Sequence, residues 1–103
     1  MNASETGDVM TDKTLGVYKL AVDCGRMGSL DAVFVASRGD VAEVMGQEIH
    51  FGEILGKHSD VSVKMREDKL YLVSEEPKLV ELVLEHGLST GPNPIHYWKD
   101  QQE

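Results

Sequence analysis

The sequence predicts an α+β fold, with a small, mostly antiparallel sheet of four or five strands and two helices covering one face. Two observations support this. Short segments with alternating or continuous apolar residues indicate strands, and two segments with apolar residues at helical spacing indicate helices. Glycine-containing or capping sequences separate most of these segments. The predicted order is strand–strand–helix–strand–strand–strand–helix.

The first half contains a predicted hairpin followed by a short helix. Residues 17–23 and 30–36 form the two strands, and the glycines within residues 25–28 permit the turn between them. Ser37 or Asp40 is suited to cap the helix. Its apolar stripe consists of Val41, Val44 and Met45, and it ends at Gly46.

The second half continues with three strands and a helix. We expect a strand at 47–55 and then a second hairpin, in which 61–65 pairs with 70–73. Residues 74–77 read Ser-Glu-Glu-Pro, a sequence typical of a helix start, and Gly87 ends the helix.

The two ends of the chain differ in character. Residues 1–14 are mostly polar, and we expect them to be disordered. Residues 15–98 form the single domain. Its last part, 88–98, is an arm that folds back over the body, because disordered tails rarely carry Ile, Tyr and Trp together. Residues 99–103 are expected to be a flexible tail.

Composition excludes several classes of function. The 103 residues carry a formal net charge of −8, which repels nucleic acid and anionic lipid. No apolar run is long enough to cross a membrane. The single cysteine, Cys24, requires no oxidising compartment, so a cytoplasmic location is the expectation. The four histidines lack zinc-ligand spacing, and neither a metal nor a cofactor is indicated.

The predicted third strand runs into the most conspicuous polar segment. With strict alternation, Ile49, Phe51 and Leu55 share the apolar face with Glu53, whose carboxylate would point into the core. A bulge at Gly52 would instead shift the register and turn Glu53 outward. Beyond it lie Lys57, His58, Ser59 and Asp60. Glu53 is then either a structural clasp for the amides of the loop or part of an acid–base or anion-binding site. The spacing Gly52-x-x-x-Gly56-Lys57 does not match a phosphate-binding P-loop.

The sequence therefore favours a small acidic binding or regulatory module. We expect it to contact a protein, or a second copy of itself as a homodimer, through loop 56–60 and the aromatic arm. The predicted contact residues are Glu53, Lys57, His58, Ser59, Asp60, Tyr97 and Trp98. The alternative is a small enzyme or anion-binding protein that uses Glu53, Lys57 and His58. The sequence leaves enzymatic activity open and favours it less, because so short a chain has little room for a concave pocket.

Overall fold

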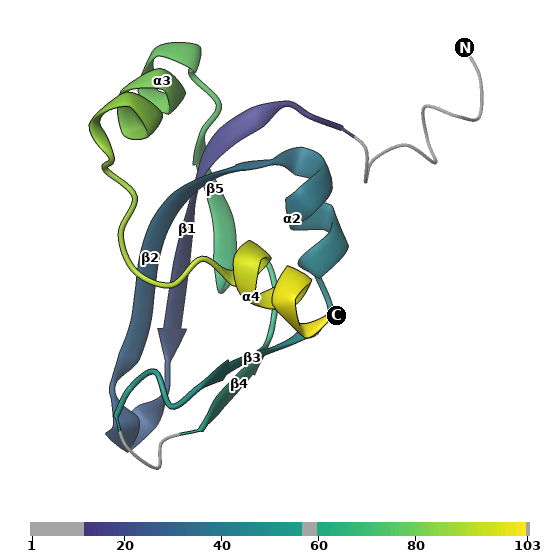
Figure 1. Ribbon diagram of the computed structural model, residues 1–103, viewed down its shortest axis with the longest axis vertical. Coiled ribbons are helices and arrows are strands. Elements are labelled where there is room, and N and C mark those ends of the chain that lie inside the picture. The colour runs from purple at the N-terminus through teal and green to yellow at the C-terminus, as the bar shows by residue number, and fades with distance from the viewer. Residues whose placement is uncertain (1–11, 57–59, 103) are drawn as a thin grey trace, which may run out of the picture.

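The computed structural model describes residues 12–56 and 60–102, and they form an α+β fold with two antiparallel sheets and three α-helices (Figure 1). The larger sheet has the strand order β2-β1-β5, and the smaller one pairs β3 with β4. The α+β class and the small antiparallel sheet are therefore confirmed. The predicted single sheet and the number of helices need correction.

The predicted first hairpin is confirmed. β1 (Leu15–Asp23) pairs with β2 (Ser29–Ser37) over their full length, from Leu15 opposite Ser37 to Asp23 opposite Ser29. A short 3₁₀ turn, η2 (Gly25–Met27), joins them. Gly25 and Gly28 both have positive φ there, which side chains with a Cβ rarely adopt.

The predicted second hairpin is wrong. β4 (Val61–Lys64) pairs with β3 (Glu48–Gly52), whereas β5 (Leu70–Ser74) crosses to pair with β1. The physical reason is the burial of Met65 and Leu70, which lie on either side of the turn between β4 and β5 and are both almost fully buried. Placing the two strands in different sheets lets both side chains enter one core between the sheets.

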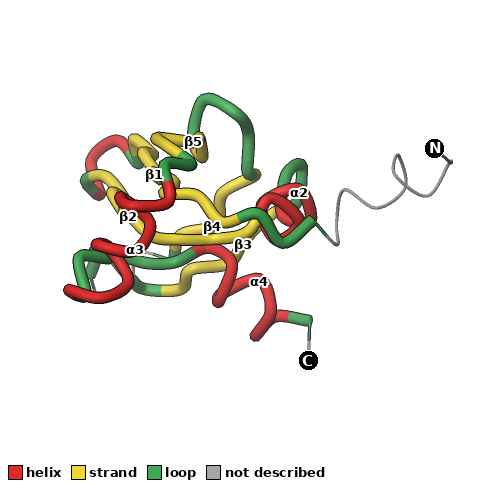
Figure 2. Tube along the Cα trace, turned by 90° about the horizontal axis from the view of Figure 1, so that it is seen from above, coloured by secondary structure: helices red, strands yellow, loops and turns green. Residues whose placement is uncertain are grey.

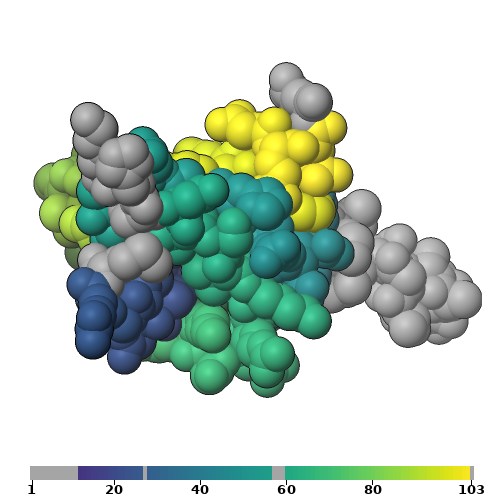
Figure 3. Space-filling model, turned by 90° about the horizontal axis from the view of Figure 1, so that it is seen from below, coloured from purple at the N-terminus to yellow at the C-terminus, as the bar shows by residue number. Residues whose placement is uncertain are grey.

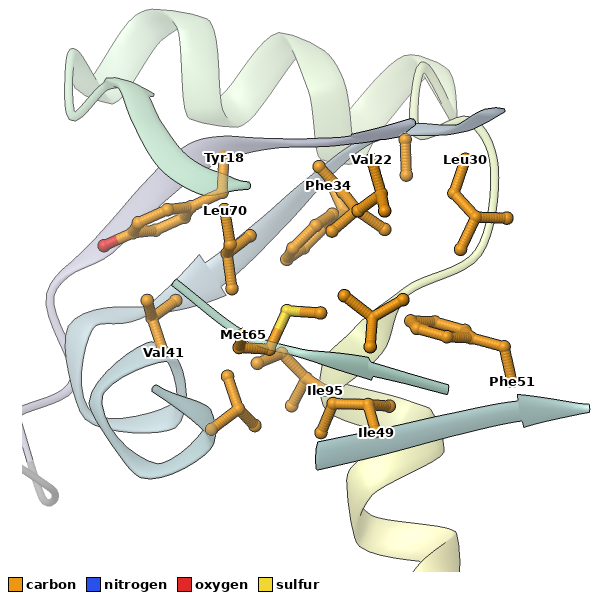
Figure 4. Close-up of a cluster of buried hydrophobic side chains, with 14 of the residues drawn as sticks. Tyr18, Val22, Leu30, Phe34, Val41, Ile49, Phe51, Met65, Leu70 and Ile95 are labelled. Carbon is orange, nitrogen blue, oxygen red and sulfur yellow. The ribbon is translucent and has the colours of Figure 1, made fainter. Parts of the chain in front are cut away.

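The core lies between the three-stranded sheet on one side and β3, β4 and the C-terminal helix on the other. Figure 4 shows its side chains converging from both sides. Alternate residues of β1, such as Tyr18, Leu20 and Val22, point into this core. Val17, the residue before Tyr18, belongs to a second, smaller cluster on the opposite face of the sheet.

The first two helices begin and end close to where the sequence indicates. α2 (Arg38–Val44) is capped by Ser37, whose Oγ accepts a hydrogen bond from the Asp40 backbone N–H at 3.1 Å. α3 (Pro77–His86) is capped by the Glu76 side chain and ends at Gly87 in the left-handed conformation. Ser74, an expected cap, instead accepts from the Glu76 backbone N–H at 3.0 Å, just before the helix.

The two helices do not share one face of the sheet. α3 packs on Val17, Val33 and Val35, whereas Val41 and Val44 of α2 lie in the main core. Figure 2 shows α2 and α3 apart from each other, with α3 at the left of the view and α2 at the right. The predicted arrangement, with both helices on one face, is therefore wrong.

The C-terminal arm contains a third helix, α4 (Pro94–Gln101), which the predicted order of elements does not include. Proline is compatible with the first turn of a helix, because its missing N–H needs no partner there. The Asn93 side chain caps the helix by accepting from the Ile95 backbone N–H at 2.9 Å. Residues 99–101, assigned to a flexible tail, are therefore helical.

The N-terminal boundary also shifts. The backbone oxygens of Asp12 and Thr14 accept hydrogen bonds from Gly39 and Arg38 at the start of α2. Residues 12–14 are thus held against the domain, contrary to the expected disorder through residue 14. Residues 1–11 lie outside the described part of the chain.

Candidate functional site

The described surface contains an open groove between the start of β1 and α3. Its volume is about 700 Å³. Thr14 and Leu15 contribute from the β1 side, and Glu75 contributes from the connection into α3. The lining residues are Thr14, Leu15, Glu75, Pro77, Val80, Glu81, Leu84 and Glu85.

The apolar floor exists because α3 carries more apolar residues than the sheet covers. Val80 and Val83 are buried against the sheet. Leu84 lies one turn after Val80 on the helix and is 57% exposed, and Leu15 across the groove is 43% exposed. A three-stranded sheet covers only the central stripe of this helix, so the flanking leucines stay accessible.

The rim of the groove is acidic. Glu75, Glu81 and Glu85 are its charged residues, and no lysine or arginine is among the residues that line it. Glu81 and Glu85 are exposed and lie four positions apart on α3, so they follow the same flank of the helix. Within the described chain Glu81 has no ion-pair partner, and Glu85 contacts only its neighbour His86, at 3.7 Å.

A charge network fixes the end of the groove at Glu75. Arg38 Nε donates to Glu75 Oε2 at 2.6 Å and Arg38 Nη2 donates to Oε1 at 2.5 Å, so the contact is bidentate. Asp12 Oδ2 lies 3.6 Å from Arg38 Nη1. This network joins the start of α2 to the segment that leads into α3, and its member Glu75 also lines the groove.

The network shifts the pKa values of its members. The hydrogen bonds from Arg38 lower the pKa of Glu75, and the same pairing raises the pKa of Arg38. The pKa of Asp12 is lowered mainly by the backbone hydrogen bond from Thr14. Burial, and then the nearby charge of Glu75, raise the pKa of the Tyr18 phenol. Both carboxylates are therefore ionised at neutral pH.

The structure corrects the orientation predicted for Glu53. β3 ends at Gly52, which has a φ of 72°, and the pairing with β4 shifts register between His50 and Gly52. This irregularity ends the strand alternation, and the Glu53 residue is exposed, not turned into the core. Its backbone oxygen accepts from the Gly56 N–H at 3.4 Å in the turn that follows.

The other predicted loop residues are only partly placed. Lys57, His58 and Ser59 lie outside the described residues. Asp60 is exposed and lines a second, smaller crevice of about 290 Å³ between the ends of β1 and β4. Asp23, Cys24, Lys64 and Lys69 also line this crevice, so its carboxylates and ammonium groups are balanced in number.

The predicted aromatic contacts Tyr97 and Trp98 pack within the chain. The Tyr97 ring lies 4.9 Å from the Phe51 ring, measured between centroids. The Trp98 indole N–H donates to Glu43 Oε2 at 2.9 Å. Figure 3 shows α4, in yellow, seated against the neighbouring α2 and β3 surface. Both rings are partly buried against the main core.

A serine–histidine pair lies apart from the groove. His50 Nδ1 is 2.6 Å from Ser62 Oγ across the β3–β4 pair, and both residues are exposed. His50 lines neither hollow. Among residues 12–56 and 60–102, no group of three or more histidine, cysteine, aspartate or glutamate residues is arranged to hold a metal ion.

Comparison with families of known proteins, with curated proteins and with solved structures finds no match. Within the described residues, no helix is long and apolar enough to cross a membrane. The function is therefore inferred from the surface of this chain alone.

The sequence prediction missed the groove, although one signal for it was present. Five of the six residues from Leu79 to Leu84 are apolar, more than one helix face can bury. The sequence did not reveal that the sheet beneath that helix has only three strands.

Proposed function

We propose that this protein is a small binding or regulatory module that acts in the cytoplasm and recognises another protein through the groove between β1 and α3. The observation that supports the proposal most is the apolar floor of the groove. Leu15 and Leu84 expose about half of their surface beside the buried Val80. Covering such side chains provides a favourable free energy of association.

The groove replaces the aromatic arm as the proposed contact surface. Tyr97 and Trp98 are already used in packing α4 on its own chain, and the Trp98 N–H has an internal acceptor. Loop 56–60 stays a proposed second contact. The strands that precede and follow it in the sequence, β3 and β4, lie away from α3 (Figure 1).

An anion-binding or enzymatic role is the alternative, and the crevice near Asp60 is where it would be located. Lys64 and Lys69 could attract an anion there, but Asp23 and Asp60 oppose them. Glu53, which the alternative requires, is not among the residues that line this crevice. The geometry thus supports the binding module better.

Selection of peptides from a displayed random library tests the proposed function. The immobilised full chain should enrich a defined sequence pattern, and the same selection on Leu84→Ser should lose it. Leu82→Ser is the matched control, since Leu82 is 46% exposed on the same helix but does not line the groove. Enrichment that persists unchanged on Leu84→Ser would place the binding surface elsewhere and refute the proposal.

A further inference from the structure

We infer that the groove binds a basic amphipathic helix of another protein, with apolar residues on one face and Lys or Arg along the flanks. This inference rests on the proposed function and adds the chemical class of the partner. Residues of the groove determine both the apolar and the charged side chains that the partner must carry.

The apolar requirement follows from the spacing of the floor. Val80 and Leu84 are one turn apart on α3, and Leu15 lies across the groove from them. The helical stretch from Pro77 to Glu85 rises about 12 Å, which matches two turns of a docked helix. A helix with apolar residues at positions i, i+4 and i+7 presents side chains over that length.

The charge requirement follows from the rim. Glu81 and Glu85 are separated by about 6 Å along the helix axis, the same rise that separates Lys or Arg residues four positions apart on a partner helix. Glu75 is already paired with Arg38, so these two exposed glutamates carry the rim charge available to a partner. A cationic partner also approaches a chain of net charge −8 with a long-range attraction.

The same charges disfavour two other occupants. Residues 1–11 would be close enough in sequence to reach a groove lined by Thr14, but they contain Glu5 and Asp8 and no lysine or arginine. A second copy brings another net charge of −8, and its own α3 presents the same acidic flank. Like-charge repulsion therefore favours a different, basic protein over either one.

Binding of two matched synthetic peptides tests the inference. The basic probe is a helical peptide of about 14 residues, or four turns, with leucines at i, i+4 and i+7 and lysines beside them. The acidic probe replaces every lysine by glutamate. Fluorescence anisotropy with the full chain should show at least tenfold tighter binding of the basic probe at low salt, and this preference should shrink as salt rises.

Four variants, two of them controls, assign that affinity to the groove. Leu84→Ser should weaken binding of the basic probe about tenfold, whereas Leu82→Ser should not. Glu81→Gln with Glu85→Gln should remove most of the preference for the basic probe. Glu67→Gln with Asp68→Asn, in the exposed turn after β4, removes the same charge elsewhere and should leave most of the preference.

The outcomes separate this inference from the proposed function. If both probes bind equally and both depend on Leu84, the groove is a binding surface but the basic partner class is wrong. If neither probe depends on Leu84, both proposals fail. Deleting residues 1–11 provides a last check, because a large gain in affinity would show that the chain's own N-terminal segment occupies the groove.

Discussion

Two residues after α3, Thr90 and Gly91, explain how the chain passes close to the edge of the three-stranded sheet. The backbone N–H and oxygen of Thr90 bond to the oxygen and N–H of Val33, at 2.8 and 2.9 Å, along the outer edge of β2. Gly91 follows at a φ of 74°, and a Cβ there would overlap the Asp31 carbonyl oxygen and lie 2.9 Å from Ala32 Cα. The close approach of two backbones thus depends on the absence of a side chain.

Gly91→Ala should therefore destabilise the fold by more than the cost of placing an alanine in a left-handed backbone conformation. Gly87→Ala is the matched control, since Gly87 has a φ of 61° with nothing within 4 Å of an added Cβ. We expect about 1 kcal/mol for Gly87→Ala and about 2–4 kcal/mol for Gly91→Ala in urea unfolding. Equal losses would mean that the segment at Gly91 does not approach β2 closely.

Trp98, the only tryptophan, reports directly on the position of α4. Because its ring packs on its own core, we expect fluorescence emission at shorter wavelength than in the unfolded chain, unchanged over a broad dilution series. Emission that shifts to longer wavelength on dilution would indicate that α4 packs on a second copy instead. Emission like that of the unfolded chain at every concentration would show that α4 is undocked.

At the scale of elements, local signals predicted local structure well. The paired strands 17–23 and 30–36, the Ser37 cap and the Gly87 helix end all depend on neighbouring residues, and the structure confirms them. The pairing of β5 with β1 depends on how Met65 and Leu70 share one core, which no local pattern reveals. Strict alternation placed Glu53 in the core, whereas the register shift near Gly52 agrees with the alternative of a bulge there, which local sequence allows but does not decide.

The segment at residues 12–14 offers a test of an element boundary. Deleting residues 1–14 removes the acceptors for the Arg38 and Gly39 backbone N–H groups and also removes Asp12. This truncation should lower the melting temperature by several degrees relative to deletion of residues 1–11. Identical melting temperatures would show that residues 12–14 contribute nothing to the fold.

The Arg38 network makes the joint between α2 and α3 sensitive to acid. Glu75 and Asp12 have folded pKa values below their usual 4.5 and 3.8, so the folded chain binds fewer protons than the unfolded chain in acid. Their contribution to stability is complete above those usual values and is lost as the pH falls through the lower folded ones.

Arg38→Gln should therefore make stability fall less steeply below about pH 4.5, while lowering stability at pH 7. Urea unfolding as a function of pH measures both effects. Lys78→Gln removes the same charge from the exposed side of α3 and controls for net charge. If the two variants show the same acid dependence, the Arg38 contacts do not lower the pKa of Glu75.

At the scale of the whole molecule, the candidate binding surface arises from a mismatch in size. An amphipathic helix with a wide apolar face rests on a three-stranded sheet that covers only part of it. Leucines that the sheet leaves uncovered line the groove, and the acidic residues beside them make it negatively charged. The sequence indicated the apolar helix and the acidic net charge. It did not indicate that exposed leucines and glutamates line one groove, because that depends on the sheet order β2-β1-β5.

Chemical-shift mapping tests the central claim, that the groove is the binding surface, most directly. The full chain, labelled with ¹⁵N, is titrated with the basic helical peptide. We predict that the largest amide shift changes occur at residues 14–16 and 75–85, with little change at the ends of β1 and β4 around the smaller crevice. Changes concentrated at residues 53–64 or in α4, with none along α3, would contradict the account.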